Sequence, residues 1–146
     1  MFLLDTNVYI EAFTRGPDHA GFRAFHAAAL PQLILSAVVV HELRVGARSV
    51  PQRRHLDELV EVFRTRRRLH VPSLATWQLA ASVDQDLRGI GRYAASLAQR
   101  SFANDILLAV SARELGATIV THNLADFEVI GRVLPVTAVP PWPAAT

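Results

Sequence analysis

The stretch Phe2-Leu3-Leu4-Asp5-Thr6-Asn7 combines the pattern of a buried strand with that of a helix start. Its three apolar residues suit a short strand, and the polar residues after them offer the capping chemistry that begins a helix. Residues 8–13 then carry apolar side chains at helical spacing. We therefore expect a strand that runs directly into a helix, with Asp5 at the junction.

The same kind of junction recurs at Ser36, which separates an apolar run from a helical pattern. Residues 123–127 can be read as a simple turn. We expect strands at 2–4, 33–35, 69–71, 117–121 and 133–136. We expect helices at 8–13, 19–29, 37–47, 51–63, 74–87 and 101–115. Asp18 would cap the second helix, Gly89 and Gly91 would end the fifth, and Gly116 would end the sixth. Short apolar strands alternating with helices predict an α/β fold, with a parallel sheet covered by helices on both faces.

The chain has 146 residues, of which 51% are hydrophobic, and this is typical of one compact domain. We place that domain at residues 1–138, followed by a Pro-rich tail at residues 139–146. Phe63, Trp77 and Phe102 are most simply core residues, and Trp77 or Trp142 could instead serve at an interface. The lack of cysteine excludes disulfides and thiolate metal sites. No apolar run reaches the roughly 18 residues that span a bilayer, and no basic leader precedes Asp5, so we expect a cytoplasmic protein without membrane contact.

All 15 basic residues are arginines, although the formal net charge is only +2. Residues 44–68 hold eight arginines and three acids, a net charge of +5. A genome rich in G and C would produce the same bias, and an arginine-rich helix face is usually just solvated. Arginine also binds phosphate oxygens in pairs, which suits an RNA backbone. Our candidates for contact with RNA or with an acidic protein segment are Arg44, Arg48, Arg92 and Arg100.

Several acids fall where the predicted sheet would gather them. Ligands of such sheets bind at the carboxyl ends of the strands, where Asp5 lies and where Glu42 follows the second strand. Asp105 begins an apolar helix, and Asn123 and Asp126 follow the strand at 117–121. Three of these acids have simpler interpretations. Asp5 and Asp105 could be helix caps, and Glu42 could be a solvated helix residue. His122, beside them, is more simply a surface residue than a substrate contact.

Carboxylates gathered in one cleft repel one another unless a cation neutralises them. Oxygen ligands without cysteine suit Mg²⁺ or Mn²⁺, which also bind phosphate oxygens. Such ions activate water in phosphodiester hydrolysis. This set of residues therefore indicates metal-dependent phosphodiester chemistry.

These residues also resemble the motifs of a known family. Leu3-Leu4-Asp5-Thr6-Asn7, Ser36 to Glu42, Asn104-Asp105 and Ile119-Val120-Thr121-His122-Asn123 with Asp126-Phe127 are similar to the PIN-domain family, and within it to VapC-like toxins of type II toxin-antitoxin pairs. The resemblance covers nearly the whole chain in the same order. It implies a three-layer α/β/α PIN-like domain with a central parallel sheet, Mg²⁺-dependent endoribonuclease activity, a VapB-like antitoxin as partner, and a homodimer.

The resemblance also implies roles for individual residues. Asp5 and Asp105 would be the direct metal ligands, and Glu42 would act through water. The fourth position is open, since relatives place an acid either where this chain has Asn123 or at Asp126. The groups expected to fix carboxylate orientation are Thr6, Asn7, Thr121 and Asn123.

Two rival interpretations have other consequences. A catalytically weak module could bind RNA or a partner through the same fold and basic face, because the fourth acid is displaced. A phosphatase or receiver-like protein could use Asp5 as a nucleophile, but the chain lacks a second aspartate beside it and has no lysine.

Overall fold

The computed structural model describes residues 1–16 and 19–142 and is built on one parallel sheet. The strand order is β3-β2-β1-β4-β5, and every neighbouring pair runs parallel. The strands are β1 (Phe2–Leu4), β2 (Leu33–Ser36), β3 (Leu69–His70), β4 (Thr118–Val120) and β5 (Ala138–Val139). The predicted parallel sheet is therefore confirmed.

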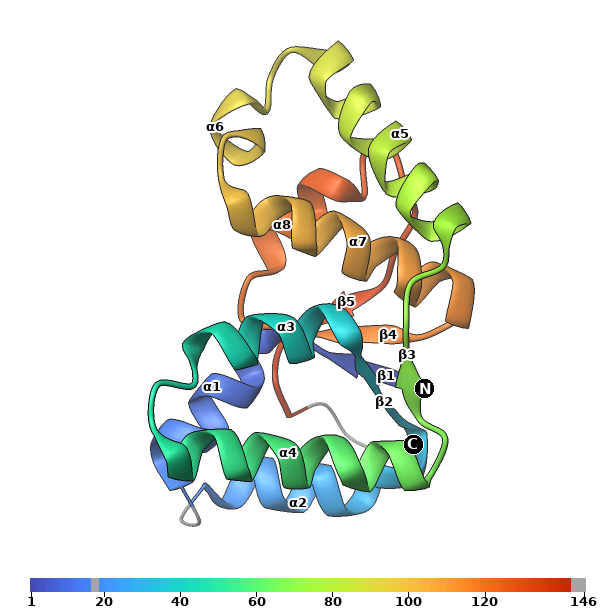
Figure 1. Cartoon of the computed structure of the whole chain (residues 1–146). Coiled ribbons are helices and arrows are strands. Elements are labelled where there is room, and N and C mark those ends of the chain that lie inside the picture. Colours follow the sequence, from blue (N-terminus) through green and yellow to red (C-terminus); the bar gives the residue numbers. More distant parts are fainter. Residues whose placement is uncertain (17–18, 143–146) are drawn as a thin grey trace.

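Helices cover both faces of this sheet, as predicted. Figure 1 shows α2 and α4 on one side and α7, with α5 packed outside it, on the other. The helices are α1 (Thr6–Arg15), α2 (Ala20–Ala29), α3 (Ala37–Gly46), α4 (Val50–Thr65), α5 (Leu74–Ile90), α6 (Ala94–Leu97), α7 (Arg100–Leu115) and α8 (Leu124–Ile130), and a 3-10 turn, η2 (Leu30–Gln32), follows α2. The three-layer α/β/α arrangement is confirmed.

The central strand β1 explains why the layers form. Leu3 is fully buried and pairs with Ile34 of β2 on one side and Ile119 of β4 on the other. A parallel strand covered on both faces is apolar throughout, and that is the pattern of Phe2–Leu4. The chain builds β2 and β3 on one side of β1 and then returns to place β4 on the other. The crevice at that reversal, between the ends of β1 and β4, is where such sheets bind ligands.

The predicted strand at 133–136 was wrong. These residues follow α8 in a turn, in which the Leu134 amide donates to Ile130 O at 3.0 Å, and the fifth strand is Ala138–Val139. Leu134 is buried in the core, so this segment is apolar because of packing and not because of sheet pairing.

Other element boundaries differ in smaller ways. Gly89 lies inside α5, and the helix ends at Gly91, whose φ of 74° is the left-handed value that glycine adopts easily. Residues 124–130 form a helix and not merely a turn, and α6 was not predicted. The cap predicted at Asp18 lies outside the described residues, and His19 caps α2 through its side chain.

The aromatic residues expected in the core divide into two groups. Phe63 and Phe102 are buried, but Trp77 is 57% exposed on α5, so its core placement was wrong. Near the expected start of the tail, Val139 pairs with Val120 of β4, and the Trp142 ring packs against Phe22. Within the described residues, no helix has both the length and the apolar character that a membrane span requires.

Candidate active site

The candidate site lies where β1 and β4 end side by side. The Asp5 amide donates to Val120 O at 2.9 Å, so the residues that follow the two strands are neighbours. Asp5 leads into α1 and Thr121 follows β4, and both side chains are buried. The carboxyl ends of β1 and β4, where the sequence predicts a ligand, therefore carry the polar residues that it places there.

Asp5 is fixed through both of its carboxylate oxygens. Oδ1 accepts from the Thr6 amide at 2.6 Å, which caps α1 as the simpler interpretation expected. Oδ2 accepts from the Thr121 hydroxyl at 2.7 Å and from Asn7 Nδ2 at 2.8 Å. Burial raises the pKa of Asp5 more than these hydrogen bonds lower it, and the nearby charge of Glu42 adds to the increase. Asp5 is thus both a helix cap and a carboxylate in a cluster of acids.

Glu42 is a half-buried residue of α3 with a partner on each oxygen. Oε2 accepts from the Thr6 hydroxyl at 2.5 Å, and Oε1 accepts from Asn104 Nδ2 at 2.9 Å. A freely solvated helix residue would show no such contacts. Asn104 was not singled out from the sequence, although its place beside Asp105 was a signal that could have done so.

Asp105 does not cap a helix. Because α7 begins at Arg100 with Gln99 as its cap, Asp105 lies in the second turn, and its capping interpretation is excluded. The residue is 8% exposed. Its pKa is raised to about 8, first by burial, then by repulsion from Asp5 and Asp126, by a hydrogen bond with Asp126, and by the charge of Glu42. The last four causes show that the four acids share one electrostatic environment.

The two candidates for the fourth position touch each other. Asn123 Nδ2 donates to Asp126 Oδ2 at 2.5 Å, and the Asn123 amide donates to the Thr121 hydroxyl at 2.9 Å. Asp126 lies in the first turn of α8, where a carboxylate also interacts favourably with the helix dipole. The structure therefore brings Asn123 and Asp126 into contact, and the Asp126 carboxylate lies close to Asp105.

The four acids offer oxygen donors and an excess of negative charge. Burial is the largest cause of the raised pKa values of Asp5 and Asp105, and the charges of the neighbouring acids raise them further. A hard divalent ion such as Mg²⁺ or Mn²⁺ fits this donor set. In the present side-chain positions, however, no three His, Asp or Glu residues among those described form a ready ligand set. The chemistry of the donors fits a metal, and the carboxylates would have to reorient to bind it.

The four candidate arginines lie outside this cluster. Among the hydrogen bonds and ion pairs of residues 1–16 and 19–142, none joins an arginine to the four acids. Arg44 pairs instead with Asp57 of α4, with both side chains exposed. Arg48, Arg92 and Arg100 are also exposed. Their role as contacts for RNA or a protein partner stays a prediction.

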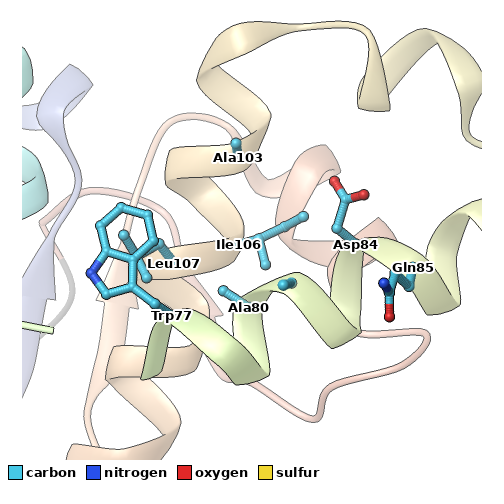
Figure 2. Close-up of a pocket in the computed structure, with 8 residues that line it drawn as sticks. Trp77, Ala80, Asp84, Gln85, Ala103, Ile106 and Leu107 are labelled. Carbon is cyan, nitrogen blue, oxygen red and sulfur yellow. The ribbon is translucent and has the colours of Figure 1, made fainter. Parts of the chain in front are cut away.

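A separate hollow lies between α5 and α7. Figure 2 shows this groove, which has a volume of about 330 Å³ and contains none of the four acids. Its wall is mostly apolar and is formed by Trp77, Ala80, Ala81, Asp84, Gln85, Ala103, Ile106 and Leu107. The carboxylate site and the apolar groove are therefore distinct features of the surface.

Comparisons with known proteins agree on one family. A family model described as "PIN domain" matches residues 2–133. The chain is 31% identical to the plasmid stability protein StbB of Pseudomonas syringae, across 99% of this chain and 100% of that protein. It is 28% identical to the VapC ribonuclease Y4jK of Sinorhizobium fredii, with the same coverage.

Solved structures show the same fold. DNA-bound VapBC from Salmonella typhimurium matches with a TM-score of 0.70 and 24% identity, over 95% of this chain and 96% of that chain. FitAcB from Neisseria gonorrhoeae matches with a TM-score of 0.66 and 24% identity, over 99% of this chain and 100% of that chain.

Proposed function

Since the chain belongs to the PIN domain family, we propose that it is a metal-dependent endoribonuclease and the toxin of a toxin-antitoxin pair. The observation that carries this proposal is the cluster of Asp5, Glu42, Asp105 and Asp126, in which the pKa of Asp105 is raised to about 8. Groups with strongly shifted pKa values concentrate at functional sites. The similarity to the VapC ribonuclease Y4jK supports the same activity.

Asp5 and Asp105 are the residues we assign to hold Mg²⁺ or Mn²⁺. When bound, the ion would supply an activated water and stabilise the leaving oxygen of the phosphodiester. Glu42, held by Thr6 and Asn104, is placed to orient a water through a free lone pair. Asp126 supplies the fourth acid, with Asn123 as the amide that orients it.

Thr121 and Asn7 have a different task in this proposal. Both donate to Oδ2 of Asp5 and so fix the direction of that carboxylate. Partners of this kind are what keep a metal ligand in its working orientation. The exposed Arg44, Arg48, Arg92 and Arg100 are our candidates for contacts to the RNA phosphates or to an antitoxin.

The proposed protein partner is a VapB-like antitoxin, and the similarity to VapBC and FitAcB structures supports it. We also propose a homodimer, for which the groove with the exposed Trp77 offers an apolar surface. Light scattering after gel filtration, on the chain alone and with its co-expressed antitoxin, measures both assemblies.

The activity is tested with antitoxin-free protein and total RNA, with Mg²⁺, Mn²⁺ or EDTA, and the cuts are located by end-mapping. The variants are Asp5→Asn and, as a matched control, Asp86→Asn, which changes an exposed acid of α5. We expect discrete cuts that need the metal, disappear in Asp5→Asn and persist in Asp86→Asn. Equal cutting by Asp5→Asn, with circular dichroism unchanged, would overturn the proposal.

A binding module is the second candidate, because the exposed arginines would serve it equally well. Calorimetry with Mn²⁺ separates the two functions. A nuclease takes up the ion stoichiometrically through the four acids, whereas a pure binding module has no need of it. Intact RNA, RNA binding and no Mn²⁺ uptake together would favour the module.

A further inference from the structure

One contact outside the cluster of acids joins α1 to the loop after β4. Glu11 Oε2 on α1 lies 2.5 Å from His122 Nε2, in an interaction between residues 111 positions apart in the chain. His122 stands between Thr121 and Asn123, each of which donates to one of the candidate acids. Neither residue of the pair touches an acid of the cluster in the described contacts, so the proposed chemistry does not use them directly.

The loop of residues 121–123 is attached to α1 at a second point. The His122 amide donates to Asn7 Oδ1 at 3.2 Å. Asn7 and Glu11 are four residues apart on α1, so they lie on the same face of the helix. The contact with Glu11 holds the ring of His122, and the contact with Asn7 holds its backbone. Together they leave the loop little freedom to rotate away from α1.

Two further groups lie near the other oxygen of Glu11, which does not face the loop. His19 Nε2 lies 3.3 Å and Arg15 Nε 3.4 Å from Oε1, and the His19 side chain is 6% exposed. The cost of desolvation opposes ionisation of Glu11, but interactions with His122 and His19 outweigh it and lower the pKa of its carboxyl. The ionised form of Glu11 is therefore favoured, and its Oε2 faces the ring of His122.

The loop in turn sets the direction of two acids. The Thr121 hydroxyl donates to Asp5 Oδ2 at 2.7 Å, and Asn123 Nδ2 donates to Asp126 Oδ2 at 2.5 Å. A loop that moves away from α1 takes both donors with it. The carboxylates would then keep their places in the chain and lose their orientation.

We infer that Glu11 and His122 are positioning residues of the nuclease site, which clamp the 121–123 loop to α1 and thereby orient Asp5 and Asp126. This inference rests on the proposed function. It assigns no chemistry to the pair, which acts only through Thr121 and Asn123.

If Glu11 and His122 only stabilised the fold, their loss would lower the unfolding midpoint. The His122 side chain is 45% exposed, and an exposed ion pair contributes little to the free energy of unfolding. A clamp should therefore affect metal affinity and loop order while the unfolding midpoint stays nearly constant. These readouts separate positioning from stability.

The experiment compares Glu11→Ala, His122→Ala, their double variant, His122→Gln and Arg15→Ala. Glutamine keeps a side-chain N–H that can donate to Glu11, and Arg15 touches Glu11 without touching the loop. Four quantities are measured: Mn²⁺ affinity by calorimetry, amide hydrogen exchange at His122 and Asn123, the RNA cleavage rate at saturating RNA, and the midpoint of urea unfolding.

We expect Glu11→Ala and His122→Ala each to weaken Mn²⁺ binding and slow cleavage on the order of 10-fold, the lower end for groups that orient metal ligands. Both should speed exchange of the two amides. The double variant should be no worse than either single variant, because one contact is lost in all three. His122→Gln should recover most of the loss, and Arg15→Ala should match the wild type.

Wild-type cleavage together with unchanged Mn²⁺ affinity and amide exchange in Glu11→Ala would overturn the inference and leave the proposed function intact. Additive losses in the double variant would also overturn it. A wild type that neither cuts RNA nor takes up Mn²⁺ would overturn the proposed function, and the inference with it.

Discussion

The hydroxyl of Thr121 donates to Oδ2 of Asp5 at 2.7 Å, across 116 positions of sequence. The same oxygen of Thr121 accepts from the Asn123 amide at 2.9 Å and from Asn7 Nδ2 at 3.2 Å. One buried hydroxyl thus connects the ends of β1 and β4 with the loop that leads to Asp126. The orientation of Asp5 and the position of the loop therefore depend on the same hydroxyl.

Replacing Thr121 with valine, which has nearly the same shape, removes that connection. We expect the Thr121→Val variant to lose about 1–3 kcal/mol of unfolding free energy, because buried polar groups lose their partner. Mn²⁺ affinity should fall by about 10-fold or more, as for other groups that orient metal ligands. Thr121→Ser keeps the hydroxyl and should retain the affinity. Urea unfolding and calorimetry measure the two effects, and equal Mn²⁺ affinities for valine and serine would contradict the prediction.

Asp105 should make stability depend on pH when metal is removed. Its folded-state pKa of about 8 lies above the ordinary value of 3.8, so the folded protein binds this proton more tightly than the unfolded chain. The resulting stabilisation is complete below the unfolded pKa and is lost as pH rises through about 8. Asp105→Asn has no proton to lose at this position. Its unfolding free energy relative to wild type should therefore increase between pH 5.5 and 8.5, by roughly 2–4 kcal/mol.

Denaturant titrations in EDTA at pH 5.5 and pH 8.5 measure the unfolding free energy of Asp105→Asn relative to wild type. Asp86→Asn, which alters an exposed acid, should follow the pH dependence of the wild type. If the unfolding free energies of wild type and Asp105→Asn changed equally between the two pH values, Asp105 would be ionised at both and its pKa would not be raised.

Metal uptake should release a proton for the same reason. At pH 7 an isolated Asp105 with a pKa of about 8 is mostly protonated, and a divalent ion binds the carboxylate form. Calorimetry with Mn²⁺ in buffers of different ionisation enthalpy should give a release near one proton at pH 7 and near zero above pH 9. The release should be much smaller in Asp105→Asn. A release that is independent of pH would contradict this account.

The elements that local chemistry determines were the ones that could be predicted. Asp5 caps α1 directly after an apolar strand, and both signals are adjacent in the sequence. The left-handed Gly116 that ends α7 is equally local, with a φ of 62°. Because the alternation of strands and helices predicts a parallel sheet, it also places Asp5 and Thr121 near each other before any coordinate is known.

Features that depend on distant contacts could not be predicted in this way. Asn104 donates to Glu42 from 62 positions away, and although its place beside Asp105 marks it as a candidate, its local sequence does not indicate which residue it contacts. The two-residue β5 is defined by pairing with β4, whereas the more apolar residues 133–136 pack as a turn. Trp77 lies at the groove between α5 and α7 and is 57% exposed, which depends on how α5 packs on α7.

The fourth position of the site is decided by comparing Asn123 and Asp126. Asn123 Nδ2 donates to Asp126 Oδ2 at 2.5 Å, so an amide N–H stabilises this carboxylate where a second carboxylate would repel it. Asp126→Asn removes a charge that contributes to the raised pKa of Asp105. We expect it to lower the pKa of Asp105 and to reduce RNA cleavage by on the order of 100-fold, the upper part of the range for groups that support a metal site.

Asn123→Asp should destabilise the metal-free protein without weakening metal binding. It places a second carboxylate against Asp126, so in EDTA the unfolding free energy should fall by about 1–2 kcal/mol. In Mn²⁺ the added charge is compensated, and metal affinity should be equal to or higher than that of the wild type. Thermal unfolding with and without Mn²⁺ measures both. If Asn123→Asp restored cleavage to Asp126→Asn in a double variant, either position could hold the fourth acid; no restoration would assign that acid to Asp126 alone.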